Sequence, residues 1–191
     1  MLGKIKQLER SGEYDLIVVD GPAAGHAITF LTSASGLADS VRSGPVRSQA
    51  DAVLAMLRDP VRCQVVLVTL PETTPVNEVI ETAFALEDQV GVQLGPVVVN
   101  GVDLGVGLPA ASEMSSIVGD LDAATAVTLT DAADFRRSRR EMERQELARL
   151  AEELPIPQIV LPARLVAGLV AADVTDLAAG LGGLAPVETA Q

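Results

Sequence analysis

The chain has 191 residues, which suits one domain with a sizeable core and is too short for two ordinary domains. Its 26 acidic and 14 basic residues give a net charge of −12, a field that repels nucleic-acid phosphates and anionic membrane surfaces. Aromatic residues make up 2% of the chain, which argues further against a protein that stacks the bases of a single strand. We therefore expect no nucleic-acid partner.

Cysteine content and apolar runs indicate the compartment. The single cysteine, Cys63, excludes an internal disulfide and a metal site built on several thiolates of one chain. No apolar run approaches the roughly 18 residues of a spanning helix, and the first residues lack the apolar stretch of a signal peptide. These features predict a cytoplasmic protein that is not an integral membrane protein.

Strand and helix patterns alternate along the chain. In chain order they predict a strand at 15–20, a helix at 48–58, a strand at 64–70, a helix at 75–90, a strand at 96–100, a helix at 134–153 and a strand at 158–161. The strand segments are continuously apolar, which is typical of parallel strands buried on both faces. We expect an α/β fold with a doubly wound, mainly parallel sheet and helices on both faces, over residues 1–177. A flexible tail is expected at 178–191, where periodicity is lost.

The first predicted strand delivers Asp20 into the turn Gly21-Pro22, at the edge where doubly wound sheets bind ligands. In nucleotide hydrolases an aspartate at this place holds Mg²⁺, usually through water, because Mg²⁺ prefers oxygen ligands and keeps much of its hydration. The alternative is that Asp20 only begins a turn by accepting backbone hydrogen bonds. The spacing alone does not separate these two interpretations.

Two further segments each allow two interpretations. The Gly-rich stretch 101–109 follows a predicted strand, so it is either a mobile loop at the carboxyl edge of the sheet or a plain surface connection. The helix at 134–153 carries an arginine cluster interspersed with glutamates. This pattern favours a solvated charged helix over a surface for an acidic partner. The cluster comprises Arg136, Arg137, Arg139, Arg140 and Arg144.

Four motifs resemble those of the ArsA-type anion-transporting and tail-anchored-protein-targeting ATPases, a branch of the P-loop NTPases. The run Asp20-Gly-Pro-Ala-Ala-Gly-His is similar to the family's second switch segment, Asp-Thr-Ala-Pro-Thr-Gly-His, although Gly21 and Ala24 replace its threonines and the proline falls one place earlier. Val68-Thr-Leu-Pro-Glu-Thr-Thr-Pro-Val resembles a second family signature. Val97-Val-Val-Asn-Gly-Val and Leu161-Pro-Ala-Arg-Leu-Val resemble its adenine-binding strand end and adenine loop.

The resemblance implies that the chain is the C-terminal part of an ATPase domain that binds ATP or ADP with Mg²⁺. It implies that Asp20 lies near the metal, through water, and that His26 is a switch residue. The alternative for His26, the only histidine, is a capping or packed imidazole.

For the base, the resemblance implies that Asn100 reads adenine, since an amide offers a donor and an acceptor together. Pro162 and Ala163 would pack against the ring, and Glu72 would contact a loop or the ligand. The alternatives are a turn role for Asn100 before Gly101 and a solvated turn glutamate at Glu72.

The phosphate-binding loop of this family, which ends in Gly-Lys-Ser/Thr, does not occur in the chain, and neither does its first switch. The only Gly-Lys pair, Gly3-Lys4, is followed by Ile5. We therefore expect an ATPase portion that is inactive in isolation and pairs as a homodimer or with another ArsA-like chain. The alternative is a noncatalytic module that regulates a complete ATPase. A weaker one is a response-regulator-like or flavodoxin-like domain, and the cargo and any membrane or protein partner stay undefined.

Overall fold

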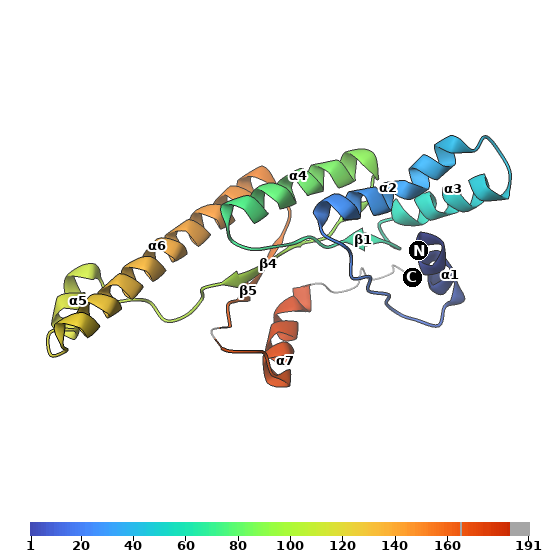
Figure 1. Cartoon of the computed structure of the whole chain (residues 1–191). Coiled ribbons are helices and arrows are strands. Elements are labelled where there is room, and N and C mark those ends of the chain that lie inside the picture. Colours follow the sequence, from blue (N-terminus) through green and yellow to red (C-terminus); the bar gives the residue numbers. More distant parts are fainter. Residues whose placement is uncertain (165, 184–191) are drawn as a thin grey trace. The chain divides into compact units, whose positions relative to one another are not determined.

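A computed structural model describes residues 1–164 and 166–183 (Figure 1). The described residues divide into two compact units. Unit 1 comprises Met1–Leu67 and Asn77–Val97, and unit 2 comprises Val68–Val76 and Val98–Gly183.

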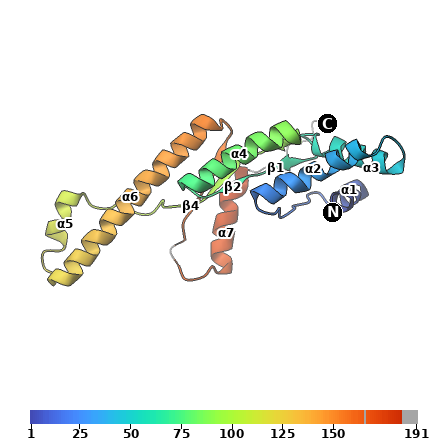
Figure 2. The same ribbon diagram turned by 45° about the horizontal axis from the view of Figure 1, so that its top comes forward.

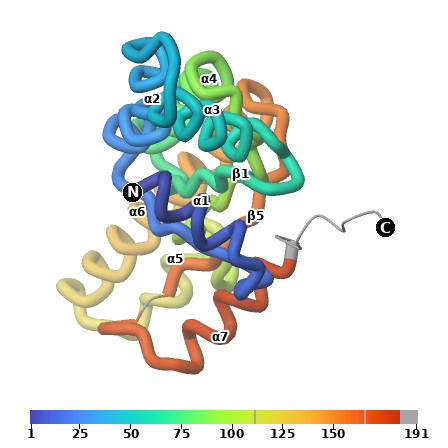
Figure 3. Tube along the Cα trace, turned by 90° about the vertical axis from the view of Figure 1, so that its right-hand side faces the viewer, coloured from blue at the N-terminus to red at the C-terminus, as the bar shows by residue number. Residues whose placement is uncertain are grey.

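Unit 1 begins with three helices, α1 (Leu2–Ser11), α2 (Ala24–Ser40) and α3 (Pro45–Leu57). Helices α2 and α3 lie side by side (Figure 3). The buried residues of α2 are Ala34 and Ala38, whose small side chains allow close approach of a neighbouring helix. Pro45 occupies the first turn of α3, where its missing N–H costs no hydrogen bond.

Helix α4 (Thr73–Gln89) begins in unit 2 and continues through unit 1. Its buried positions follow helical spacing, with Val76 and Leu86 each 1% exposed and Ala83 fully buried. Gly91 then adopts a φ of 72°, and its N–H donates to the Leu86 carbonyl at 3.0 Å. This confirms the helix predicted at 75–90 and its glycine stop.

The sheet of unit 1 has two strands, β1 (Gln64–Val65) and β3 (Gln93–Leu94), which pair in parallel. Gly95 extends the contact by donating from its N–H to the Val65 carbonyl at 2.9 Å. The strand predicted at 64–70 is thus divided, because β1 belongs to this sheet whereas its second part, β2 (Val68–Thr69), belongs to unit 2.

The prediction of a strand at 15–20 is wrong. Among the described residues this segment pairs with no strand, and Leu16, Val18 and Val19 are 73%, 81% and 44% exposed. An extended segment becomes a strand only when a neighbour supplies hydrogen-bonding groups, and a buried parallel strand needs cover on both faces. Apolar composition alone cannot provide either.

Unit 2 contains a three-stranded sheet in the order β2-β4-β5, with β4 at Val97–Val102 and β5 at Gln158–Pro162. Strands β2 and β4 are parallel, with Val68 opposite Val98 and Thr69 opposite Val99. Val97 and Val99 are fully buried. The strands predicted at 96–100 and 158–161 are confirmed.

The helices of unit 2 are α5 (Ala111–Ile117), α6 (Ala123–Glu153) and α7 (Ala171–Gly180), followed by a 3₁₀ turn, η1 (Leu181–Gly183). Helix α6 is a single long helix with α5 beside its N-terminal end (Figure 2). It begins earlier than predicted because Asp122 caps it, accepting a hydrogen bond from the Thr125 N–H at 3.1 Å. Of the tail predicted at 178–191, residues 184–191 lie outside the described residues.

The described residues therefore form a mixed α/β structure with short parallel strands in two open sheets. A single doubly wound sheet was expected, but Val66 and Leu67, between β1 and β2, join no ladder. No described helix is both long enough and apolar enough to cross a membrane.

Candidate functional site

The strand ends of unit 2 bring four predicted site residues to one edge of the sheet. Glu72 follows β2 after the buried Pro71, and Asn100 lies in the second half of β4. Since β2 and β4 are parallel, their carboxyl ends meet at the same edge. Pro162 ends β5, and Ala163 donates from its N–H to the carbonyl of Val102, the last residue of β4, at 2.8 Å.

Asn100 is the exposed position of a strand whose preceding residues, Val97 to Val99, are buried. Its side-chain amide makes no hydrogen bond with the rest of the described chain, so both its donor and its acceptor are available to a ligand. Gly101 follows with a φ of 79°, a conformation that L side chains rarely adopt. This positive φ lies within the end of β4, which continues to Val102.

Glu72 is held by a helix that is distant in sequence. Arg139 of α6 donates from Nη2 to Glu72 Oε1 at 3.2 Å and from Nε to Glu143 Oε1 at 3.1 Å. Glu143 is 2% exposed, and its second oxygen accepts the Asp103 N–H at 2.9 Å. The turn after β2 and the loop after β4 are therefore connected through α6.

The same turn is attached to α6 at a second point. Thr73 donates from its hydroxyl to Glu146 Oε1 at 2.9 Å, and Arg149 donates to Glu146 Oε2 from Nη2 at 2.7 Å. Burial alone would raise the pKa of Glu146, but the hydrogen bonds from Arg149 and Thr73 outweigh burial and lower its pKa. Glu146 is thus a charged residue of α6 that holds the turn after β2 through Thr73.

The loop after β4 is anchored by Asp103. Arg136 donates to both of its carboxylate oxygens, and the Gly105 N–H donates to Oδ1 at 3.0 Å. The hydrogen bonds from Arg136 lower the pKa of Asp103 from 3.8 to about 2, despite the opposing effect of burial.

Two more arginines hold this loop through its carbonyls. Arg140 donates to the Val106 carbonyl at 3.2 Å, and Arg137 donates to the Pro109 carbonyl at 3.1 Å. Interpreting the arginine cluster as a solvated helix face is therefore wrong for Arg136, Arg137 and Arg140. It holds for Arg144, whose side chain is 74% exposed and pairs with Glu141 of its own helix.

Sequence reasoning missed these anchors, although a signal was present. The residues of α6 that reach the strand ends recur every three or four positions, which places them on one face of the helix. Such a set is Arg136, Arg139, Arg140, Glu143 and Glu146, and Arg137 and Arg149 of the same helix also contact these segments. A polar face of this kind looks like a solvated surface until its partners are known.

Asp20 and His26 belong to unit 1. Asp20 is exposed and lines an apolar cavity together with Val19, Pro22 and Phe30. His26 lies in the first turn of α2, with an exposed side chain. Within the part of the chain that the structure describes, no three His, Cys, Asp or Glu residues cluster as metal ligands would.

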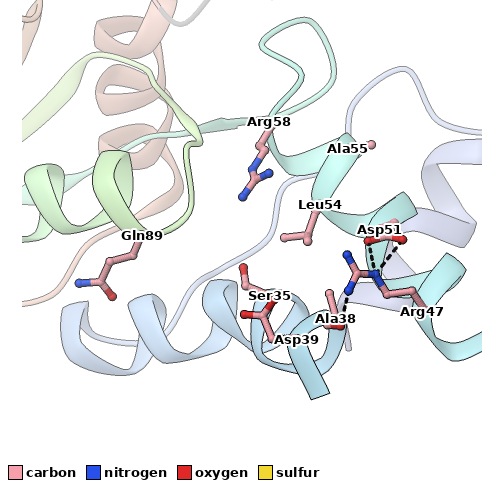
Figure 4. Close-up of a pocket in the computed structure, with 9 residues that line it drawn as sticks. All are labelled: Ser35, Ala38, Asp39, Arg47, Asp51, Leu54, Ala55, Arg58 and Gln89. Carbon is pink, nitrogen blue, oxygen red and sulfur yellow. Dashed lines mark hydrogen bonds and ion pairs between the residues drawn. The ribbon is translucent and has the colours of Figure 1, made fainter. Parts of the chain in front are cut away.

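A second cavity of unit 1, about 440 Å³ in volume, lies between α2, α3 and the end of α4 (Figure 4). Arg47 on its wall donates to both oxygens of Asp51 and, at 2.6 Å, to the Ala38 carbonyl. Arg58 donates to the Val90 carbonyl at 3.1 Å. The cavity contains none of the predicted site residues, and its arginines have structural partners.

Comparison with known proteins gives a distant relationship to ArsA-like ATPases. ATPase BagA of Mycobacterium tuberculosis is 30% identical over 188 residues, which cover 85% of this chain and 53% of that protein. Mb3704 of Mycobacterium bovis, named as a candidate ATPase, aligns equally well. A protein of Halobacterium salinarum, named as a candidate arsenical pump-driving ATPase, is 33% identical over 104 residues, or 50% of this chain and 16% of that protein.

The chain spans about half the length of the first two curated relatives. No protein-family model matches it.

Proposed function

We propose that this chain is part of an ArsA-like, ATP-binding and Mg²⁺-dependent ATPase, and that the strand ends of unit 2 bind the adenine base. The observation that carries the proposal is the gathering of Asn100, Pro162 and Ala163 at one edge of the β2-β4-β5 sheet. The names of the relatives support the ATPase class.

The chemistry of these residues suits a purine. The exposed amide of Asn100 offers one donor and one acceptor, which matches the paired acceptor and amino group on an adenine edge. Pro162 and Ala163 are half-buried and provide apolar surface for the ring. Glu72 would contact a loop or the ligand from the neighbouring strand end.

The proposed Mg²⁺ and switch roles fall on residues of unit 1. Asp20 is a single exposed carboxylate, which fits a Mg²⁺ ion bound through water better than one coordinated directly. When bound, Mg²⁺ neutralises the charge on the phosphates during phosphoryl transfer. His26, in the first turn of α2, would serve as the switch residue.

A second candidate function is a noncatalytic module that pairs with or regulates a complete ATPase in the cytoplasm. Its motivating observation is that Gly3 and Lys4, the only Gly-Lys pair of this chain, lie inside helix α1 and therefore form no phosphate-binding loop. Because such loops supply much of the electrostatic stabilisation in phosphoryl transfer, we expect negligible hydrolysis by this chain alone. In this alternative, a second ArsA-like chain would supply the phosphate-binding loop.

The test is a titration of the chain with a fluorescent ATP analogue and Mg²⁺. Asn100→Ala should weaken binding about tenfold, because one base-recognising side chain is lost. Asn77→Ala is the matched control, since Asn77 is an exposed asparagine of α4 and not one of the predicted site residues. Equal binding by wild type and Asn100→Ala would overturn the adenine site. Binding that requires a loop-bearing ArsA-like chain would favour the regulatory module.

A further inference from the structure

An unbroken hydrogen-bonded chain joins the two loops that flank the candidate base site. It runs from Glu72 to Arg139 at 3.2 Å, from Arg139 to Glu143 at 3.1 Å, and from Glu143 to the Asp103 N–H at 2.9 Å. Its two ends lie in the turn after β2 and in the loop after β4. Arg139 is the residue that contacts both carboxylates.

The links of this chain differ in burial. Glu143 is 2% exposed, so its charge must keep its partners, because an unpaired buried carboxylate is strongly destabilising. Glu72 and Arg139 are 42% and 45% exposed in their side chains, and exposed ion pairs contribute little to stability. The contact between Glu72 and Arg139 can therefore be removed without unfolding the protein.

The geometry also separates Arg139 from its neighbours on α6. Of the two loops, Arg136, Arg137 and Arg140 contact the one after β4, through Asp103 and through the Pro109 and Val106 carbonyls. Arg137 also pairs with Asp134 of its own helix. Arg139 alone among these four arginines reaches Glu72. A planar guanidinium can hold two carboxylates in fixed directions at once, which a lysine ammonium does less well.

We propose that Arg139 is a positioning residue of the candidate nucleotide site. It orients Glu72 and, through Glu143, ties the turn after β2 to the loop that follows Asn100, so that a change at one is transmitted to the other. This inference rests on the proposed function for the identity of the ligand, whereas the coupling between the loops is a property of the ligand-free chain.

Coupling is tested first without nucleotide, by hydrogen exchange of the full chain read by mass spectrometry. Glu72→Ala removes a side chain that does not touch Asp103, yet it should raise exchange in peptides covering 103–108 by about threefold. Arg139→Gln should also raise exchange in these peptides. Arg139→Lys should keep part of the protection against exchange that the wild-type arginine gives. Arg144→Gln is the matched control, since Arg144 pairs with Glu141 on the same helix. A change confined to residues 72–74 in Glu72→Ala would overturn the coupling.

The ligand is then added as the fluorescent ATP analogue with Mg²⁺. Arg139→Gln should weaken binding about tenfold, with Arg144→Gln unchanged. If wild type binds no analogue, the proposed function fails, but the ligand-free exchange still decides the coupling. If wild type binds and Arg139→Gln binds equally, the positioning role is overturned while the base site stands.

Discussion

Arg136 holds Asp103 in a two-pronged ion pair, with Nε 2.6 Å from Oδ2 and Nη2 2.8 Å from Oδ1. Such paired hydrogen bonds constrain direction as well as distance, and therefore fix the start of the loop after β4 against α6. The Asp103 side chain is 13% exposed and that of Arg136 is 30% exposed, so solvent screens the pair only in part. The contribution of this ion pair to stability should therefore depend on pH.

The pKa of Asp103 is lowered to about 2 in the folded protein, from an ordinary value of 3.8. Its contribution to stability is therefore complete above about pH 4 and is lost as the pH falls toward 2. We expect Asp103→Asn to lower the free energy of unfolding by about 1 kcal/mol at pH 7, with the difference shrinking below pH 4. Urea unfolding at several pH values measures it.

Asp131→Asn is the control for this series, because Asp131 is exposed on α6, the helix that carries Arg136. A stability difference between wild type and Asp103→Asn that stays constant down to pH 2 would contradict the assignment.

Glu146 is 9% exposed and bonded to Thr73 and Arg149. Its removal takes away the acceptor of the Thr73 hydroxyl and one of the two carboxylates that Arg149 contacts, the other being Glu153. We expect Glu146→Ala to cost about 2 kcal/mol and Thr73→Val about 1 kcal/mol of unfolding free energy. The double variant should cost less than the sum of the two, because both changes remove the same bond. Additive costs would show that the Thr73 hydroxyl and Glu146 do not stabilise the protein through a shared hydrogen bond. Glu152→Ala is the control, because Glu152 is exposed on the same helix as Glu146.

Gly101 has a positive φ of 79°, and a Cβ placed there would meet only Leu70, at an ordinary 3.8 Å. The cost of Gly101→Ala should therefore come from backbone strain rather than from a clash, at about 1–2 kcal/mol. Gly107→Ala, at a position with open space and no positive φ, should be nearly neutral. Thermal unfolding of both variants compares them, and equal melting temperatures would argue against strain at Gly101.

Val18 is 81% exposed although the sequence predicts a buried strand there, so substitution distinguishes the two descriptions. We expect Val18→Ser to change the unfolding free energy by less than about 0.5 kcal/mol, as is usual for surface positions. Val99→Ala, at a fully buried position of β4, should cost about 2 kcal/mol. A large loss of unfolding free energy in Val18→Ser would instead support the buried strand that the sequence predicts.

Much of the local structure could be predicted from the sequence. Pro75 lies in the first turn of α4, Gly91 follows the end of that helix, and the valines of β4 form a strand as expected. These signals depend on neighbours within a few residues along the chain. The nucleotide roles of Asp20, His26, Glu72, Asn100, Pro162 and Ala163 stay predictions that rest on resemblance.

Features that depend on distant partners could not be predicted. Whether residues 15–20 form a strand depends on a neighbouring strand, which apolar composition does not reveal. The partners of the α6 arginines were equally hidden, because Arg136 meets Asp103 and Arg139 meets Glu72 across 33 and 67 residues of chain.

Periodicity along the sequence was thus enough to establish most of the helices and strands at 75–161, since backbone hydrogen bonding and apolar spacing act over short distances. The folded arrangement was needed to show that α6 is the anchor of the two candidate loops. An ion pair forms only where folding brings opposite charges within a few ångströms, and that proximity is not encoded in the spacing of either residue.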